Sequence, residues 1–547
     1  MRIQTSNNVA IAALFGASAL AVDPCTHVPA LAKQIAGISV TSASWTLKNE
    51  LAVSGWSTDA ALPNQYAFCR VKGHIEYSGN NSLAFELWLP EQDSYNERYL
   101  VAGKVKHPVR SKNQTDFTRT GNGGLAGTID TSAMILNLNR GYAVAAGDSG
   151  HDVALNGNGT TQPGQYISFL NSPAQTKAWI HNSIAMLTPP TRELSALYYG
   201  SKPSFSYFSG CSTGGAQGFA LAQLHPDLFD GIYAGSPGNW YSHLILSFLW
   251  NAKHTKGDAF LNQSVLNFTT NAILAKCDGL DGVVDGLIEN PLNCPFNIRS
   301  LACPDSSKAS RTNVTCLTQP QIKAIEAIYA GPTDSRNGDV IYPGYTLGSE
   351  KEWLLQETSL YLNYSTPILQ NLVFNNVSFD VSQFDFGADV DKVDAIASPL
   401  IDGISTDLSA FRKRGGKMIV TQGELDGSLQ WCHLAHYASW AIAEYHSKWK
   451  RVRIFQSVYD SRYVQIHKGF SFHVNANVTF PNIGGGHCGP ASSFPSAPST
   501  YDTDDALRAW VENDTFPESI LTSRPLDGSN RTRKICPWPQ NARLKSP

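Results

Sequence analysis

The chain has 547 residues, of which 42% are hydrophobic and 16% charged, and its formal net charge at pH 7 is −3. This length is enough to bury a large core and exceeds what a single domain usually needs. The near-neutral charge, without a long run of lysine and arginine, argues against nucleic acid or an anionic membrane as a partner.

The N-terminus predicts a signal peptide over residues 1–21. Arg2 supplies a positive charge, residues 9–20 form an apolar run, and Ala19-Leu20-Ala21 is a small-x-small cleavage site. The run is shorter than the roughly 20 residues that span a bilayer; an ordinary N-terminal helix is the alternative. All ten cysteines lie beyond this segment, as do eleven Asn-x-Ser/Thr sequons. We therefore expect a secreted, oxidised and glycosylated extracellular protein.

Short apolar runs separated by glycine-rich turns extend from about residue 35 to 235 and predict buried strands. The clearest runs are 99–103, 141–146 and 204–208. A helical pattern through residues 219–224 ends before Pro226. Strand patterns resume at 417–421 and 452–455, after a region of different character.

The segment Gly-Cys-Ser-Thr-Gly at residues 210–214 fits G-x-S-x-G, the sharp turn that lifts a serine above a sheet. A predicted strand precedes it and a predicted helix follows it, and the N-terminus of that helix would direct N–H groups at an anion. Ser212 is thus the candidate nucleophile. A plain glycine and serine turn is the alternative.

Residues 236–400 contain four of the ten cysteines, several sequons and an aspartate cluster, and we interpret them as an inserted domain. The cluster places Asp278, Asp281 and Asp285 within eight residues between glycine turns. Carboxylate oxygens at this density suit Ca²⁺. The spacing is not that of an EF-hand, so a solvated acidic loop is the alternative.

A catalytic acid and a histidine are expected after the insertion, in that order. Asp426 follows the strand at 417–421 and is the candidate acid, with Glu424 as its competitor. His487 lies in the glycine-rich turn at 484–489 and is the candidate base. Cys211 precedes Ser212 and Cys488 follows His487. A disulfide between these cysteines would bring their Cα atoms to about 5.5–6 Å and hold the serine near the histidine.

The Cys-Ser pair, the later Asp and the final His-Cys pair resemble the hallmark of the fungal tannase and feruloyl esterase family, and the likeness covers nearly the whole mature chain. It implies an α/β-hydrolase core with an inserted calcium-binding lid domain: signal peptide 1–21, first catalytic part 22–235, lid 236–400 and second catalytic part 401–547. It also implies a Cys211–Cys488 disulfide. The structural Ca²⁺ of the lid would take side chains of Asp278, Asp281 and Asp285 and carbonyls of Val283 and Leu287.

The resemblance implies a serine carboxylic ester hydrolase acting on phenolic-acid esters from plant cell walls or tannins. Ser212 attacks the ester carbonyl, His487 carries the proton and Asp426 orients His487, with no cofactor in the chemistry. The N–H groups of Thr213 and of Gly123 or Gly124 would hold the oxyanion. We expect a feruloyl esterase; a tannase and a non-catalytic calcium-stabilised binding protein are the alternatives. A homodimer stays open.

Four aromatic residues after Ser236 would either wall a phenolic ring or form the core of the lid: Trp240, Tyr241, Phe248 and Trp250. Further disulfides are expected at Cys25–Cys69, Cys277–Cys294 and Cys303–Cys316, which leaves Cys432–Cys536 by elimination. Residues 104–120 and about 458–480 interrupt the family pattern beside the predicted site. They are either surface loops or non-coding sequence retained in the gene.

Overall fold

The computed structural model describes residues 23–54, 61–103, 124–152, 162–304, 314–405, 407–423, 477–482, 485–490, 493–537 and 542–543. The signal peptide prediction, Gly123, Asp426 and its competitor Glu424, Cys432 and the predicted strand at 452–455 all lie outside these residues.

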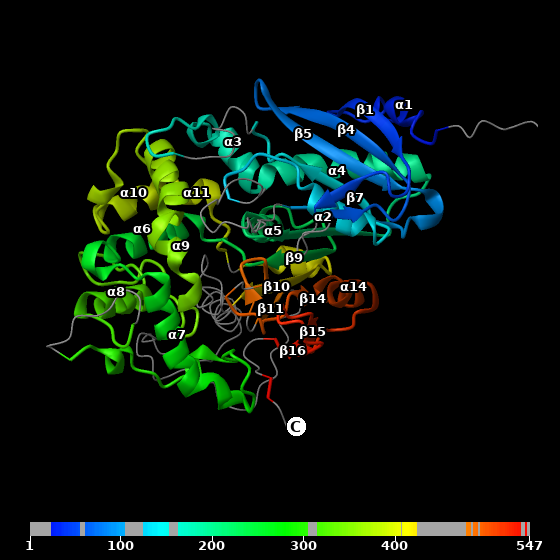
Figure 1. The fold of residues 1–547 in the computed structure, drawn as a ribbon. Coiled ribbons are helices and arrows are strands. Elements are labelled where there is room, and N and C mark those ends of the chain that lie inside the picture. Colours follow the sequence, from blue (N-terminus) through cyan, green and yellow to red (C-terminus); the bar gives the residue numbers. More distant parts are fainter. Residues whose placement is uncertain are drawn as a thin grey trace, which may run out of the picture.

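The described chain is built around a nine-stranded sheet (Figure 1). In spatial order its strands are β1 (Ser39–Thr46), β4 (Phe68–Tyr77), β5 (Asn81–Pro90), β7 (Ala143–Gly147), β6 (Arg98–Ala102), β8 (Phe205–Cys211), β9 (Gly231–Gly235), β10 (Lys417–Gly423) and β11 (Asn477–Asn482). The pairings from β1 to β7 are antiparallel, and those from β7 to β11 are parallel. A mainly parallel sheet with helices on both faces confirms the predicted α/β-hydrolase core.

Each face of the sheet is covered by helices because the buried strands carry apolar side chains on both sides. Helices α4 (Ser183–Tyr199) and α5 (Thr213–Leu224) pack on one face, where Phe208 and Val101 are fully buried. Helices α2 (Thr131–Leu138) and α14 (Thr503–Asn513) cover the other, over Leu100 and Tyr207. Successive side chains of β6 and β8 point alternately into one core and the other, as side chains do in a strand.

The predicted strands at 99–103, 141–146, 204–208 and 417–421 correspond to β6, β7, β8 and β10, and the predicted helix to α5. The segment at 458–480 was expected to be either a surface loop or retained non-coding sequence, and only its last four residues are among those described. Residues 477–480 belong to β11, where Val478 pairs with Ile419 and Phe480 with Thr421. These four residues are therefore part of the sheet.

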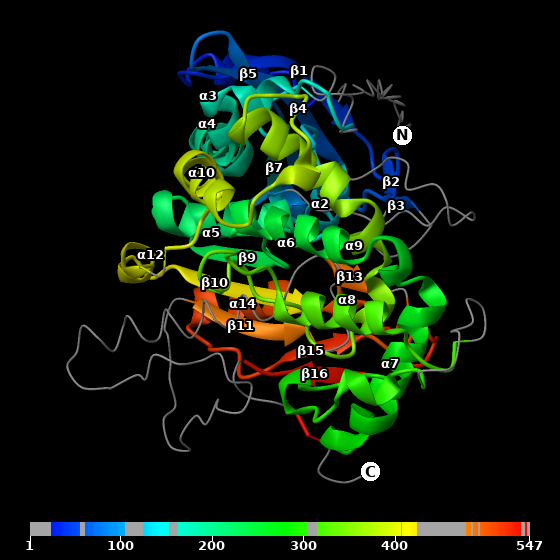
Figure 2. The same cartoon turned by 90° about the vertical axis from the view of Figure 1, so that its left-hand side faces the viewer.

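Between β9 and β10 the described chain adds no strand to the main sheet and is largely helical. Its helices lie together at one side of the sheet and stand in front of it after a quarter turn (Figures 1 and 2). They are α6 (Tyr241–His254), α7 (Gln263–Cys277), α8 (Gln319–Ala330), α9 (Leu354–Thr358), α10 (Ala388–Ile396) and α11 (Ser398–Ile401). The helix α12 (Ser409–Lys413), beyond the predicted lid, lies apart from them beside β10 (Figure 2). The division into a catalytic domain and a lid at 236–400 stays a prediction.

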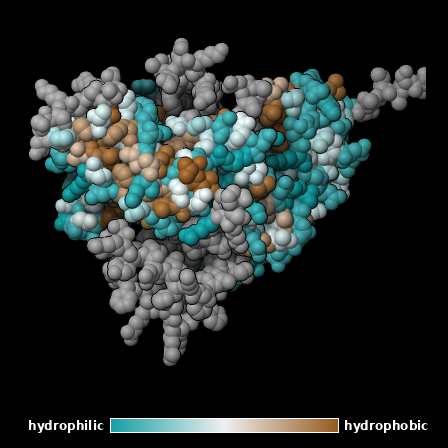
Figure 3. Space-filling model, turned by 60° about the horizontal axis from the view of Figure 1, so that its bottom comes forward, coloured by the Kyte–Doolittle hydropathy of each residue, from teal (hydrophilic) through white to brown (hydrophobic). Residues whose placement is uncertain are grey.

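Smaller elements complete the described chain. They are α1 (Val28–Ala32), α3 (Pro173–Lys177), the hairpin β2 (Ala52–Ser54) with β3 (Ala61–Pro63), the pair β12 (Gly485–Gly486) with β13 (Gly489–Pro490), and a three-stranded sheet of β14 (Thr500–Tyr501), β15 (Ile520–Ser523) and β16 (Arg533–Ile535). Within the described ranges, no helix is both long and apolar enough to cross a bilayer. The face in Figure 3 mixes hydrophilic side chains with small hydrophobic groups.

Four of the five predicted disulfides are confirmed: Cys25–Cys69, Cys211–Cys488, Cys277–Cys294 and Cys303–Cys316. Cys536 has no disulfide partner among the described residues, and its predicted partner Cys432 lies outside them.

Candidate active site

Ser212 occupies the turn between β8 and α5, with φ 62° and ψ −120°. This conformation is strained for a residue with a side chain and is the one a nucleophile elbow requires. Glycine is needed around it because the chain folds back closely. A Cβ atom on Gly210 would lie 2.6 Å from the Gly214 carbonyl oxygen, and one on Gly215 would lie 2.4 Å from that of Gly235. The predicted G-x-S-x-G turn is therefore present.

The parallel strands bring the candidate catalytic segments to one edge of the sheet. Cys211 pairs with Gly235, Gly235 with Thr421, and Thr421 with Phe480, so β8, β9, β10 and β11 end in line. Ser212 follows β8 directly, and the β12–β13 turn that carries His487 follows β11 closely. The segment with Asp426 starts after Gly423 at the end of β10, although Asp426 itself lies outside the described residues.

A disulfide fixes the serine turn to the histidine turn. Cys211 and Cys488 are bonded, and their Cα atoms lie 5.9 Å apart. Ser212 and His487 are the immediate sequence neighbours of these two cysteines, and both are half-buried. A covalent bond one residue away from each therefore limits how far the two can separate.

Gly124, one of the two candidate oxyanion glycines, lies beside the start of α5. Its carbonyl oxygen accepts hydrogen bonds from Thr213 Oγ1 at 3.2 Å and from Trp179 Nε1 at 2.9 Å. Its φ of 61° favours glycine, and a Cβ atom there would lie 2.5 Å from the Tyr364 ring. The Thr213 side chain therefore contacts the Gly124 backbone next to Ser212, and the oxyanion role of the Gly124 and Thr213 N–H groups stays a prediction.

Of the four predicted aromatic residues, Tyr241 contacts the serine turn directly. Tyr241 is buried with its hydroxyl 3.5 Å from Thr213 Oγ1, so it borders the serine turn. Burial raises the pKa of the Tyr241 phenol, and neighbouring Tyr364 raises it further, so the hydroxyl stays neutral. Trp240 stacks on His243 at 4.2 Å and belongs to the same apolar cluster as Phe248, whereas Trp250 packs edge-on against Phe386 at 5.1 Å.

Phe248 is buried and lies 5.9 Å from the Tyr364 ring. Three further side chains contact the segment 124–127 beside the serine turn and were not predicted from the sequence: Trp179, Tyr364 and His151. His151 is buried, its Nε2 lies 3.2 Å from the Leu125 carbonyl oxygen, and its backbone blocks any Cβ at Gly127. The turn Gly-Asp-Ser-Gly at 147–150 was the one available signal, because His151 follows it directly.

The residues of the predicted calcium site share one loop closed by the Cys277–Cys294 disulfide: Asp278, Asp281, Val283, Asp285 and Leu287. Asp278 accepts hydrogen bonds from two backbone N–H groups, those of Asp285 at 3.0 Å and Gly286 at 2.9 Å. Asp281 accepts one from the N–H of Val283 at 2.9 Å. In the described part of the chain, no three His, Cys, Asp or Glu residues are grouped as metal ligands.

An arginine from the C-terminal strand β16 reaches the same loop. Arg533 forms ion pairs with Asp281 at 2.7 Å, Asp285 at 2.8 Å and Glu289 at 3.1 Å. All three carboxylates are buried, and burial raises the pKa of Asp285 and that of Glu289, the latter to about 7. Asp285 Oδ1 is buried without a hydrogen-bond partner among the described residues.

Comparison with known proteins agrees with this architecture. Residues 69–546 match the family model described as tannase and feruloyl esterase. An uncharacterized esterase of Xanthomonas campestris is 29% identical over 516 residues, 88% of this chain and 82% of that protein. A protein of Aspergillus flavus named probable feruloyl esterase B-2 is 30% identical over 482 residues, 85% of this chain and 82% of that protein.

The crystal structure of feruloyl esterase B from Aspergillus oryzae shares the fold, with a TM-score of 0.76 at 24% identity over 95% of this chain and 97% of that one. The serine elbow, its disulfide to the histidine turn and the match over most of the length lead to one conclusion. The chain belongs to the tannase and feruloyl esterase family of carboxylic ester hydrolases.

Proposed function

We propose that the protein is a secreted feruloyl esterase that releases hydroxycinnamic acids from plant cell-wall esters. The observation that carries the proposal is the strained Ser212 turn, joined through Cys211 and Cys488 to the turn of His487. Relatives named feruloyl esterase B support the choice of acyl group.

In the proposed mechanism Ser212 Oγ attacks the ester carbonyl while His487 accepts its proton. His487 then donates this proton to the leaving alcohol, and Asp426 orients the imidazole and stabilises its charged form. The N–H groups of Thr213 and of Gly123 or Gly124 stabilise the oxyanion. A water molecule then attacks the acyl-enzyme and gives its proton to His487, which passes it to Ser212 Oγ as the bond to the acyl group breaks and the acid is released.

The test compares kcat/KM for methyl ferulate and methyl gallate on the purified protein and on Ser212→Ala. We expect ferulate to be the better substrate. Ser212→Ala should reduce turnover to near background while the protein stays folded, because only a hydroxyl is removed. A preference for gallate would instead favour a tannase, the other activity in the family's description.

A non-catalytic calcium-stabilised binding protein is the remaining alternative. It predicts no turnover even of an undemanding ester such as p-nitrophenyl acetate. Hydrolysis of that ester by the wild type, together with its loss in Ser212→Ala, would exclude this alternative.

The proposal includes a structural Ca²⁺ in the acidic loop, with Asp278, Asp281, Asp285, Val283 and Leu287 as its ligands. Two observations support the fit. The buried Asp285 Oδ1 lacks a partner among the described residues. The three aspartates outnumber the two arginines that face them, Arg531 and Arg533, and Glu289, whose pKa lies at about 7, adds negative charge when it is ionised. This excess of negative charge suits a divalent cation bound by hard oxygen ligands.

Asp281→Ala should lower the melting temperature and remove the protection that added calcium gives, with little change in kcat. The wild type should lose melting temperature in the presence of a chelator, and Asp258→Ala, an exposed aspartate outside the loop, is the matched control. A wild-type melting temperature indifferent to the chelator would contradict a calcium site.

Secretion is tested by N-terminal sequencing of the exported protein, which should begin after residue 21.

A further inference from the structure

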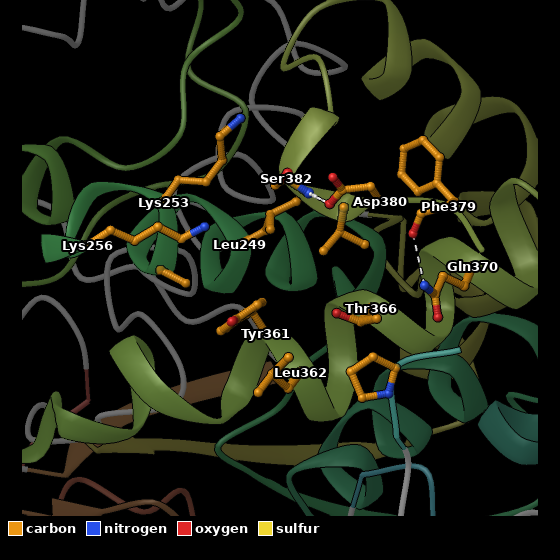
Figure 4. A pocket seen from close by; sticks show the side chains of 13 residues that line it. Leu249, Lys253, Lys256, Tyr361, Leu362, Thr366, Gln370, Phe379, Asp380 and Ser382 are labelled. Carbon is orange, nitrogen blue, oxygen red and sulfur yellow. Dashed lines mark hydrogen bonds between the residues drawn. The ribbon is translucent and has the colours of Figure 1, made fainter. Parts of the chain in front are cut away.

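A cavity of about 310 Å³ lies within the helical region between β9 and β10 (Figure 4). Its walls come from α6, the π-helical turns η10 (Tyr361–Ser365) and η11 (Ile368–Val373), the 3-10 turn η12 (Val381–Gln383) and Pro163. Neither Ser212 nor His487 lines it. Tyr241 borders the serine turn at the start of α6, whereas Ala252 of the cavity wall lies three helical turns further on, about 16 Å away.

The cavity combines an apolar wall with one unsatisfied hydroxyl. Leu249, Ala252, Leu362 and Val381 supply the apolar surface. Thr366 is 1% exposed, and its Oγ1 has no hydrogen-bond partner among the described residues. Figure 4 shows this hydroxyl directed into the cavity. Because an unpaired buried hydroxyl is destabilising, a polar ligand atom at this position would be favoured.

The mouth of the cavity is positively charged. The ammonium of Lys256 points into the space between Leu249 and Tyr361 (Figure 4), and its positive charge interacts with the Asp380 carboxylate. The ammonium of Lys253 donates a hydrogen bond to the Phe384 carbonyl at 3.2 Å and lies over the ring of Phe386.

The one carboxylate among the lining residues is that of Asp380, which accepts a hydrogen bond from the Ser382 N–H at 2.9 Å. Hydrogen bonds from Ser382, together with the positive charge of Lys256, lower the pKa of Asp380, so this group is ionised. Two ammonium groups against one carboxylate leave a net charge of +1 at the rim. The charge suits a monoanion and disfavours a cation.

We propose that this cavity binds a single-ring phenolic carboxylate, the class of acid that the proposed esterase releases. The ring would pack on the apolar wall, the carboxylate would pair with Lys256, and a phenolic hydroxyl would bond to Thr366. The volume is near the lower end of small-molecule pockets, roughly 300 Å³, which suits one ring and excludes a polysaccharide chain. The identity of the ligand rests on the proposed function; the cavity and its polar groups do not.

Calorimetric titration with ferulate tests the proposal on the whole protein. We expect Lys256→Met either to lose one of the ferulate-binding sites of the wild type or to bind ferulate at that site at least tenfold more weakly. Thr366→Val should weaken the same site about fivefold without lowering the melting temperature, because the removed hydroxyl has no partner. Lys276→Met, an exposed lysine on α7, should behave as the wild type.

Equal stoichiometry and affinity in the wild type and Lys256→Met would overturn the proposal. Hydrolysis of methyl ferulate is measured separately, so the two ideas fail separately. A protein that hydrolyses ferulate esters without a Lys256-dependent site retains only the proposed function. A protein that binds ferulate through Lys256 without hydrolysing its esters retains only the cavity site.

Discussion

His181 and His225 face each other at the end of α5, with His181 Nδ1 3.1 Å from His225 Nε2. Two neighbouring imidazoles in a largely buried position cannot both be charged at low cost. Burial, with the neighbouring His225 and Lys177, lowers the pKa of His181 to about 4. Burial also lowers the pKa of His225.

This pair makes stability depend on pH in a defined window. Above the ordinary histidine pKa of about 6.5, both the folded and unfolded states carry a neutral His181. As the pH falls from about 6.5 to about 4, the unfolded state takes up a proton that the folded state does not. The free energy of unfolding should therefore fall across this window, by up to roughly 3 kcal/mol from His181.

Urea denaturation of the wild type and His181→Gln at pH 7 and pH 4.5 measures this effect. The variant should lose less stability than the wild type between the two pH values. His27→Gln, at an exposed position, is the control and should keep the wild-type dependence. The same pH dependence in His181→Gln and the wild type would show that other groups cause it.

The sequence predicted single residues best where the chemistry is local. Ser212 was identifiable from its turn, and the Cys211–Cys488 bond from the family resemblance that the Cys-Ser and His-Cys pairs carry. Trp179 and Tyr364 were not identifiable, because they reach Gly124 from positions far along the chain and belong to no motif. Their role depends on the packing of helices against the serine turn.

Helices and strands were likewise predictable from the sequence where the signal is local, and their arrangement in space was not. The strands β7, β8 and β10 were predicted because buried parallel strands are short apolar runs between turns. The position of β7 between β5 and β6 was not predicted, since strand order depends on long-range pairing. The strand at 477–482 was missed because its sequence was read as an interruption of the family pattern, although it continues the parallel sheet beside β10.

The Cys211–Cys488 bond joins two elements across a sequence separation of 277 residues, whereas Cys303–Cys316 spans only 13. Loop entropy gives the long bond roughly 5–6 kcal/mol of stabilisation and the short one about 3 kcal/mol. The long bond also keeps the serine and histidine turns together. Its removal should therefore affect catalysis as well as stability.

We expect Cys211→Ala with Cys488→Ala to lower kcat about a hundredfold at temperatures where the protein stays folded, because small displacements of reacting groups are costly. Cys303→Ala with Cys316→Ala should lower stability and leave kcat near wild type. Esterase kinetics and thermal melts on both double variants measure this. Equal kcat in the two variants would mean that other packing positions His487.

At the scale of the whole molecule, the ion pairs of two arginines, Arg98 and Arg533, tie the C-terminal segment to distant parts of the chain. Arg98 of β6 forms a two-pronged ion pair with Glu512 of α14, with both N–O distances 2.6 Å, and Tyr207 donates to the same carboxylate at 2.7 Å. Arg533 of β16 joins the acidic loop of the helical region. The sequence predicted none of these pairs, since each joins residues more than two hundred positions apart.

Arg533→Met tests whether the C-terminal strand stabilises the helical region. The substitution leaves buried Asp281 and Glu289 without their arginine partner and Asp285 with Arg531 alone, and the free energy of unfolding should fall by about 3–5 kcal/mol. Arg299→Met is the matched control: its ion pair with Glu326 is exposed to solvent, so stability should change little. Chemical denaturation gives both values.

If the proposed Ca²⁺ binds the same carboxylates, excess calcium should restore part of the stability lost in Arg533→Met, because the cation neutralises charge that the arginine no longer balances. A loss equal to that of Arg299→Met, with or without calcium, would mean that the contact between β16 and the acidic loop contributes little to holding the two regions together.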